Sequence, residues 1–501
     1  MDDSGVTDIG LAGLLVLIGT GISMFSNFLF RLLGARFLTP SEFGSVVVGI
    51  SMINILSVVC LFGLNQGLVR FVSSESDIKI KNSYITVSIA FVVLVSMAAL
   101  IFGVFFDDLF LRLLFDSNTD PLVLYLFLCA LPFYALFKLI GGVLRGNMDS
   151  KNFVRVAKLA RPLTLLIFSA ALVFFFNTST SLAFGFLLSI SITTIWGIWL
   201  LLKNGWRPRI RYDSDYRQLF YFSAPLVISS SVFILLSYLD KILIGLYMSN
   251  QDVAIYEVAV TIASLLGLFR SAFGFLLYPK ISEAIQGDSS ELISEMYSQT
   301  TKWILFLTTP AFAILIIRPE ILIHLFGDQY QIGTIAPVIA VLAVGLFLNA
   351  VVGPNGEAML GFGRSRSVLV YNLSSVILNI ALNILLIPTI GLLGAAVASV
   401  CGYLIMNLFK SVDLYLRNGI TVVSIKSVNM SAVMFLFSAI LLEISPDISS
   451  MVGEFSLISL VSVFSLLLGV FVLWLTGGIT RSDKTLLTTV LDKLPGRINY
   501  N

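Results

Sequence analysis

Long apolar runs recur along almost the whole chain and constrain its fold more than any other feature. Each is long enough to cross a ~30 Å hydrocarbon core as a helix. Only 12% of the 501 residues are charged, against roughly 25% in soluble proteins. The sequence therefore predicts an all-α polytopic membrane protein with about fourteen transmembrane helices. They are placed near residues 10–33, 43–68, 84–106, 121–144, 153–176, 181–202, 218–248, 254–278, 301–324, 333–356, 367–388, 391–416, 427–444 and 456–477.

The cations between the runs predict the orientation of the chain. Of 31 Lys and Arg residues, 24 follow even-numbered runs or lie in the C-terminal tail. This set includes Arg161, which is counted with the loop before the fifth run. Cytoplasmic loops carry an excess of cations, so both termini are expected in the cytoplasm of a cell-membrane protein. The acidic N-terminus, MDDSGVTD, departs from this pattern. Residues 10–33 are too long for the apolar part of a signal peptide.

The two halves of the chain resemble each other at their turns. Gly34 corresponds to Gly245 at an offset of 211 residues, and Gly146 to Gly361 at an offset of 215. Six helices per repeat place both repeats in the same orientation, with a cavity expected between them. The predicted division is an N-terminal six-helix lobe, a basic cytoplasmic linker, a C-terminal six-helix lobe, and two further helices with a tail. Their boundaries are 1–203, 204–217, 218–420 and 421–501.

Four cations within or at the ends of these runs are candidates for binding an anionic substrate. Each charge costs about 2.5–3.5 kcal/mol at mid-bilayer on insertion scales, so such residues face protein or water. Arg31 and Lys241 occupy nearly equivalent places in the two repeats, in the outward halves of their helices. Arg270 lies near the middle of its run, and Lys138 lies two turns from a cytoplasmic end, where it can also snorkel.

The carboxylates near these cations have competing interpretations. Asp240 is adjacent to Lys241, and neighbouring residues on a helix point about 100° apart. Asp240 is interpreted either as a site that couples transport to a proton or cation, or as the ion-pair partner of Arg270, which we favour. Glu257 is the other candidate partner of Arg270, although its place near a helix end also fits a solvated cap, as does that of Glu357.

Motifs for catalysis or cofactor binding are not found in the sequence. It contains no P-loop, HExxH or GxSxG pattern, and its single histidine, His324, excludes a site built from several histidines. The cysteines, at positions 60, 129 and 401, are too far apart for a metal motif. We therefore expect no enzyme activity, no metal, no cofactor and no nucleic-acid partner. Asn177 begins an N-x-[ST] sequon in a loop too short to favour its use.

Two turn sequences carry a resemblance to a known family. They are ARFLTPSEFG (35–44) and IGLYMSNQDVAIYEVA (244–259). With the fourteen runs and two six-helix repeats, the chain resembles the oligosaccharide and polysaccharide flippases of the multidrug/oligosaccharidyl-lipid/polysaccharide exporter superfamily. The resemblance covers about residues 10–420. It implies a V-shaped transporter with alternating access and a cationic cavity that accepts the phosphate of a lipid carrier.

The first functional hypothesis is a flippase that moves a lipid-linked oligosaccharide on a polyprenyl phosphate or pyrophosphate to the outer leaflet. Its expected partners are the lipid-linked glycan and membrane lipid, with glycosyltransferases or a polymerase of the same pathway as candidates. The alternative is a cation-coupled multidrug exporter of the same superfamily, which typically has twelve helices and buried carboxylates. A glycan polymerase or membrane scaffold is a third hypothesis, but a polymerase is expected to carry a large outer loop.

Overall fold

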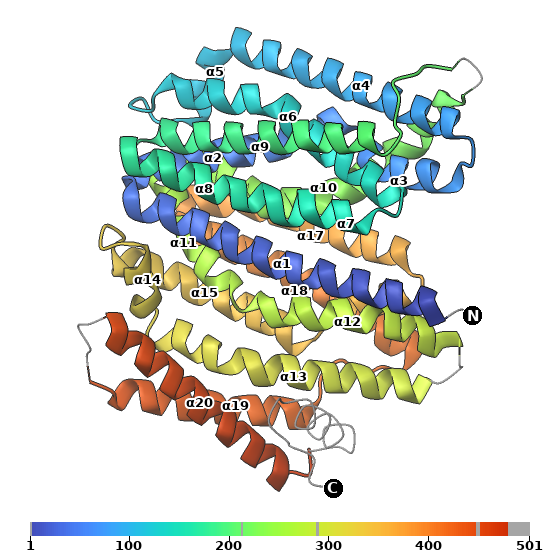
Figure 1. The fold of residues 1–501 in the computed structure, drawn as a ribbon. Helices are drawn as coiled ribbons and strands as arrows, with labels where there is room; N and C mark the ends of the chain where they lie inside the picture. Colours follow the sequence, from blue (N-terminus) through green and yellow to red (C-terminus); the bar gives the residue numbers. More distant parts are fainter. Residues whose placement is uncertain (1–2, 212–213, 287–289, 447–450, 479–501) are drawn as a thin grey trace, which may run out of the picture. The chain divides into compact units, whose positions relative to one another are not determined.

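The computed structural model describes residues 3–211, 214–286, 290–446 and 451–478. These residues form twenty α-helices and one π-helical segment, η1, and contain no β-strand (Figure 1). The all-α prediction is therefore confirmed. The helices of the first half are α1 (Asp3–Phe37), α2 (Pro40–Leu61), α3 (Leu64–Ser74), α4 (Ile78–Phe105), α5 (Asp107–Leu114), α6 (Pro121–Gly146), α7 (Ser150–Phe153), η1 (Val154–Ala160), α8 (Arg161–Phe176) and α9 (Ser179–Lys203).

The second half continues in the same way after the basic linker. Its helices are α10 (Tyr216–Tyr247), α11 (Asn250–Ser264), α12 (Gly267–Gln286), α13 (Ser290–Ile317), α14 (Glu320–Phe326), α15 (Ile332–Val351), α16 (Asn355–Gly361), α17 (Ser365–Ile390), α18 (Leu392–Asn418), α19 (Ile425–Ile444) and α20 (Met451–Leu475). Each predicted apolar run overlaps at least one of these helices.

Eleven helices of the described part are long and apolar enough to cross a membrane, which establishes a multi-pass membrane protein. The number rises to thirteen if two bent pairs are single spans. One pair bends by 45° within α10, and the other bends by 52° between α11 and α12. The predicted count of fourteen is not confirmed, since α1 is not among these candidates.

Each of the two turn sequences that carry the family resemblance contains a helix cap in which two residues exchange hydrogen bonds. At the start of α2, the Glu42 amide donates to Thr39 Oγ1 at 3.4 Å, and the Thr39 amide donates to Glu42 Oε2 at 3.1 Å. Ser249 and Asp252 make the same exchange at the start of α11, at 3.2 Å in each direction. Such a capping box satisfies two backbone donors that a helix start leaves free, so both turns end one helix and begin the next within a few residues.

Two compact units are distinguished by their internal contacts. Unit 1 comprises residues 1–262, 323–338 and 372–402, and unit 2 comprises residues 263–322, 339–371 and 403–501. In unit 1, α6 packs against α2, α3, α4 and α9. In unit 2, α13 packs against α12, α19 and α20. The lobes predicted from the internal repeat, with boundaries at residues 203, 217 and 420, stay predictions.

Candidate functional site

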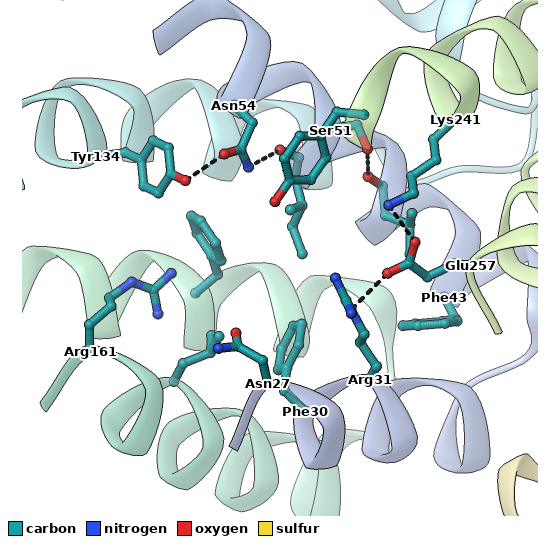
Figure 2. Close-up of a pocket in the computed structure, with 15 residues that line it drawn as sticks. Asn27, Phe30, Arg31, Phe43, Ser51, Asn54, Tyr134, Arg161, Lys241 and Glu257 are labelled. Atoms are coloured by element: carbon teal, nitrogen blue, oxygen red, sulfur yellow. Dashed lines mark hydrogen bonds and ion pairs between the residues drawn. The ribbon is translucent and has the colours of Figure 1, made fainter. Parts of the chain in front are cut away.

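A cavity of about 110 Å³ lies inside unit 1, where side chains from seven helices line it (Figure 2). The helices that contribute to it are α1, α2, α6, α8, α10 and α11, with Phe186 from α9. Its lining mixes cationic, amide, hydroxyl and aromatic side chains. They are Asn27, Phe30, Arg31, Phe43, Val47, Ile50, Ser51, Asn54, Tyr134, Arg161, Leu165, Phe186, Tyr238, Lys241 and Glu257.

Glu257 joins the two cations that the repeat predicts to be equivalent. Its Oε1 lies 2.8 Å from Arg31 Nε, and its Oε2 lies 2.6 Å from Lys241 Nζ. Figure 2 shows the carboxylate between the two side chains. The Lys241 and Glu257 side chains are only 5% and 4% exposed, whereas Arg31 is 33% exposed. A charge buried this deeply is stable only when it is paired, so Glu257 holds Lys241 in place and is not the solvated cap that its sequence position suggested.

Arg161 lies across the cavity from this triad (Figure 2). Its Nη1 donates to Ser189 Oγ at 3.0 Å, and its guanidinium lies 4.7 Å from the centre of the Phe186 ring. Among the described residues, no carboxylate lies within ion-pair distance of Arg161. The π-helix η1 ends immediately before Arg161. Such segments are frequent at functional sites in helices.

A neutral polar cluster continues the cavity along α2 and α6. Tyr134 Oη donates to Asn54 Oδ1 at 2.6 Å, and Asn54 Nδ2 donates to the Ile50 carbonyl at 2.8 Å. Lys138 reaches the same amide: its Nζ lies 3.4 Å from Asn54 Oδ1 and 3.1 Å from Ser57 Oγ. Lys138 is therefore held inward by polar partners and does not line the first cavity itself.

The charges of this cavity favour an anion. Three cationic side chains, Arg31, Arg161 and Lys241, line it with one carboxylate, Glu257. This leaves a formal excess of two positive charges in a largely enclosed space. Arginine forks suit phosphate oxygens well. The volume of about 110 Å³ is below the roughly 300–1,000 Å³ of typical small-molecule sites, so the cavity suits a phosphate-sized group.

Asp240 has partners that differ from the favoured prediction. It is 3% exposed, and it accepts hydrogen bonds from Asn383 Nδ2 at 2.8 Å, Ser399 Oγ at 2.5 Å and Tyr256 Oη at 3.0 Å. All four residues belong to unit 1. The prediction that Asp240 pairs with Arg270 is wrong, because neutral donors from α11, α17 and α18 satisfy its oxygens.

Arg270 lies in unit 2, where its Nη1 is 3.2 Å from Glu357 Oε2 and 3.5 Å from the Gly353 carbonyl. Both charged side chains are partly exposed, at 22% and 28%. Arg270 therefore pairs with Glu357, and not with Asp240 or Glu257 as the sequence suggested. Its assignment as a substrate-binding cation stays a prediction.

Sequence reasoning missed several residues of the cavity, above all Arg161, Tyr134 and Asn54. The order of cations along the chain assigns Arg161 to a cytoplasmic loop, although it lies eight residues inside the predicted run that begins at 153. That position was a usable signal, because a cation so deep in an apolar run needs a polar environment. The described residues contain no cluster of three or more His, Cys, Asp or Glu side chains that could hold a metal.

Comparison with known proteins places the chain among membrane proteins of glycan synthesis. Residues 33–333, more than half of the chain, match a family model described as polysaccharide biosynthesis protein. An uncharacterized membrane protein of Methanocaldococcus jannaschii is 25% identical over 412 residues, covering 76% of this chain and 79% of that protein. The probable low-salt glycan biosynthesis flippase Agl15 of Haloferax volcanii is 26% identical over 224 residues, covering 44% of this chain and 46% of the other.

Among solved structures, the fold is similar to that of the lipid II flippase MurJ in an inward closed conformation. The TM-score is 0.72 at 16% identity, and the match covers 90% of this chain and 98% of the other. At this identity the likeness establishes a shared fold. The predicted all-α membrane fold is therefore one that this flippase of known structure shares.

Proposed function

The chain belongs to the family of polysaccharide biosynthesis proteins, and on that premise we propose that it is a flippase for a lipid-linked oligosaccharide. It carries the glycan on a polyprenyl phosphate or pyrophosphate from the cytoplasmic to the outer leaflet by alternating access. It is a transporter and not an enzyme. The name of the Haloferax volcanii relative, a glycan biosynthesis flippase, supports this assignment.

The observation that carries the proposal is the excess of positive charge in the cavity of unit 1 that Arg31, Arg161 and Lys241 line. A bare phosphate is costly to place in a hydrocarbon core, and fixed cations in a polar cavity lower that cost. Arg161 supplies a guanidinium that no carboxylate neutralises among the described residues, and Arg31 and Lys241 share a single carboxylate. The cavity fits the phosphate of the carrier, while the glycan and the lipid tail extend beyond it.

We assign the remaining candidate residues to supporting roles within this proposal. Glu257 positions Arg31 and Lys241 through its two oxygens. Asp240, which is buried among neutral donors, couples transport to a proton or cation. The protein lies in the cell membrane with both termini cytoplasmic, and glycosyltransferases or a polymerase of the same pathway are candidate partners.

The alternative function is that of a cation-coupled multidrug exporter of the same superfamily, which we weigh for a cationic drug as substrate. Such a substrate needs a cavity with excess negative charge, because opposite charges attract in a medium of low dielectric constant. The cavity of unit 1 has the opposite sign of charge. The anionic lipid is therefore the better match.

The test is deletion of the gene, followed by mass spectrometry of lipid-linked oligosaccharide in the membrane fraction. We expect the lipid-linked glycan to accumulate and the surface glycan to disappear, with restoration by the wild-type gene.

In the deletion strain, a gene carrying Arg161→Gln should restore less than one tenth of the surface glycan at equal membrane abundance. Arg366→Gln, which changes an exposed cation at the start of α17, is the matched control. Unchanged glycan with increased drug sensitivity after deletion would favour the exporter.

A further inference from the structure

A second cavity in unit 1, of about 340 Å³, is separate from the one that holds Arg161. Its walls are largely apolar and include Leu61, Phe137 and Phe153. Two cations, Lys138 and Arg145, also line it, and no carboxylate does. The second cavity is therefore more apolar than the first, whose lining is divided about evenly between polar and apolar surface, and it contains no carboxylate.

The cations of the second cavity form one stripe on α6. Lys138, Gly141 and Arg145 follow Tyr134 at intervals of three or four residues, which places all four on one helix face. Seven residues separate Lys138 from Arg145, about 10 Å along the helix axis. Tyr134 lines the first cavity, and Lys138 contacts Asn54, which also lines it. The stripe therefore connects the two cavities.

Both cations retain donors for a ligand. Lys138 contacts only neutral oxygens, at 3.1 Å and 3.4 Å, and the Tyr134 ring at 4.5 Å. Arg145 Nε donates to the Gly141 carbonyl at 3.3 Å, and its guanidinium lies 5.8 Å from the Phe153 ring centre. Within the described ranges, neither cation forms an ion pair with a carboxylate. The remaining N–H groups can bind the oxygens of an anion.

We propose that the Lys138–Arg145 cavity is a second anion subsite, which binds the phosphate of a polyprenyl phosphate before the phosphate reaches the Arg161 cavity. This inference rests on the proposed flippase function. The apolar walls hold the first isoprenyl units, which distinguishes the ligand from free phosphate. Arg145 lies in the last turn of α6, next to a loop rich in cations that the positive-inside rule places in the cytoplasm. The second cavity is therefore the first to meet a substrate from the cytoplasmic leaflet.

Glycine at position 141 allows a sharp test, because it keeps this cavity open. A Cβ added there meets only the Phe153 ring, at 3.7 Å, an ordinary contact. Gly141→Leu therefore fills the cavity without removing a charge, and leucine favours the helix more than glycine does. Lys138→Gln/Arg145→Gln removes both charges with shorter side chains, so it does not fill the cavity. The two variants perturb the site by independent routes.

The experiment is calorimetric titration of the purified full-length protein in detergent with farnesyl phosphate, farnesol or inorganic phosphate. Wild type should bind two equivalents of farnesyl phosphate. Gly141→Leu and Lys138→Gln/Arg145→Gln should each lose one equivalent, and Arg161→Gln should lose the other. Inorganic phosphate and farnesol should bind the second cavity at least tenfold more weakly than farnesyl phosphate. Unfolding midpoints equal to that of wild type confirm that each variant is folded.

The outcomes separate this inference from the proposed function. The second subsite is overturned if both second-cavity variants still bind two equivalents of farnesyl phosphate. It is also overturned if wild type binds a single equivalent that only Arg161→Gln removes. Either result leaves the flippase assignment intact. Equal affinity for inorganic phosphate overturns the lipid assignment of the cavity. An absence of farnesyl phosphate binding, together with normal surface glycan in the Arg161→Gln strain, removes both proposals.

Discussion

Glu257 neutralises one buried cation and one that is partly exposed, so its replacement should have unequal effects on them. The Lys241 side chain is only 5% exposed, and Glu257→Gln removes the carboxylate that neutralises its ammonium group. Removing one partner of a buried pair costs about 3–5 kcal/mol. We therefore expect a clearly lower unfolding midpoint for Glu257→Gln in detergent, measured by intrinsic fluorescence.

The matched variants for this prediction lie within the same triad. Lys241→Met in the Glu257→Gln background should restore most of the lost stability, because it removes the unpaired charge. Arg31→Gln should lower the midpoint less than Glu257→Gln does, since Glu257 keeps its ion pair with Lys241 at 2.6 Å and the side chain that is lost is itself one third exposed. An unchanged midpoint in Glu257→Gln would show that the triad does not stabilise the fold.

Asp240 is a carboxyl among neutral donors, and this environment suits a group that exchanges a proton or a cation during transport. In proteoliposomes with a fluorescent lipid-linked oligosaccharide, wild-type transport should rise severalfold under an imposed proton or sodium gradient. Asp240→Asn should abolish this dependence, because a carboxamide neither ionises nor neutralises a cation. Ser399→Ala is the control: it removes one hydrogen bond to Asp240 and keeps the charge, so the dependence should remain. Gradient-dependent transport by Asp240→Asn would exclude the coupling role.

At the scale of helices, close backbone contact limits what can be changed. A Cβ added to Gly44 in α2 would lie 1.6 Å from the Asn250 carbonyl oxygen at the start of α11, whereas a Cβ at Gly21 in α1 meets nothing within 4 Å. Gly44→Ala must therefore move two backbones apart, and overpacking costs about 1–3 kcal/mol. Gly21→Ala should gain up to about 1 kcal/mol from helix propensity. Unfolding midpoints of the two variants should move in opposite directions, and a neutral Gly44→Ala would contradict the contact.

The elements themselves were predictable because long apolar runs and caps are local properties of the sequence. The cap at Thr39 and Glu42 lies in the turn sequence 35–44, between the helices predicted near 10–33 and 43–68. The side-chain partners were less predictable, since they come from distant helices. The prediction gave Asp240 a cationic partner, but its donors are a tyrosine, an asparagine and a serine. Neutral donors do not stand out in a sequence that contains 52 serines and 20 asparagines.

Arg161 shows a second reason why site residues escape sequence analysis. Assigning cations to loops by their order along the chain gives an overall asymmetry but ignores the depth of each residue within its helix. The π-helix before Arg161 adds a local change of direction that helical periodicity does not predict. In contrast, Arg31 and Lys241 were predicted as equivalent cations from the repeat, and the structure brings both to Glu257.

At the scale of the whole molecule, the parity of the span count decides the topology. An even count places both termini on one side of the membrane, and thirteen spans would place them on opposite sides. The asymmetry of loop cations favours the even count and cytoplasmic termini, which requires α1 to cross the membrane in addition to the thirteen candidates.

Three reporters test whether α1 crosses the membrane. An N-terminal epitope tag should be digested by protease only when inside-out vesicles expose the cytoplasmic face. Green fluorescent protein fused after Asn501 should fluoresce, and alkaline phosphatase inserted at Thr119, between α5 and α6, should be active. An N-terminal tag digested from the outer face, with the other two results unchanged, would show that α1 does not span and would leave thirteen transmembrane segments.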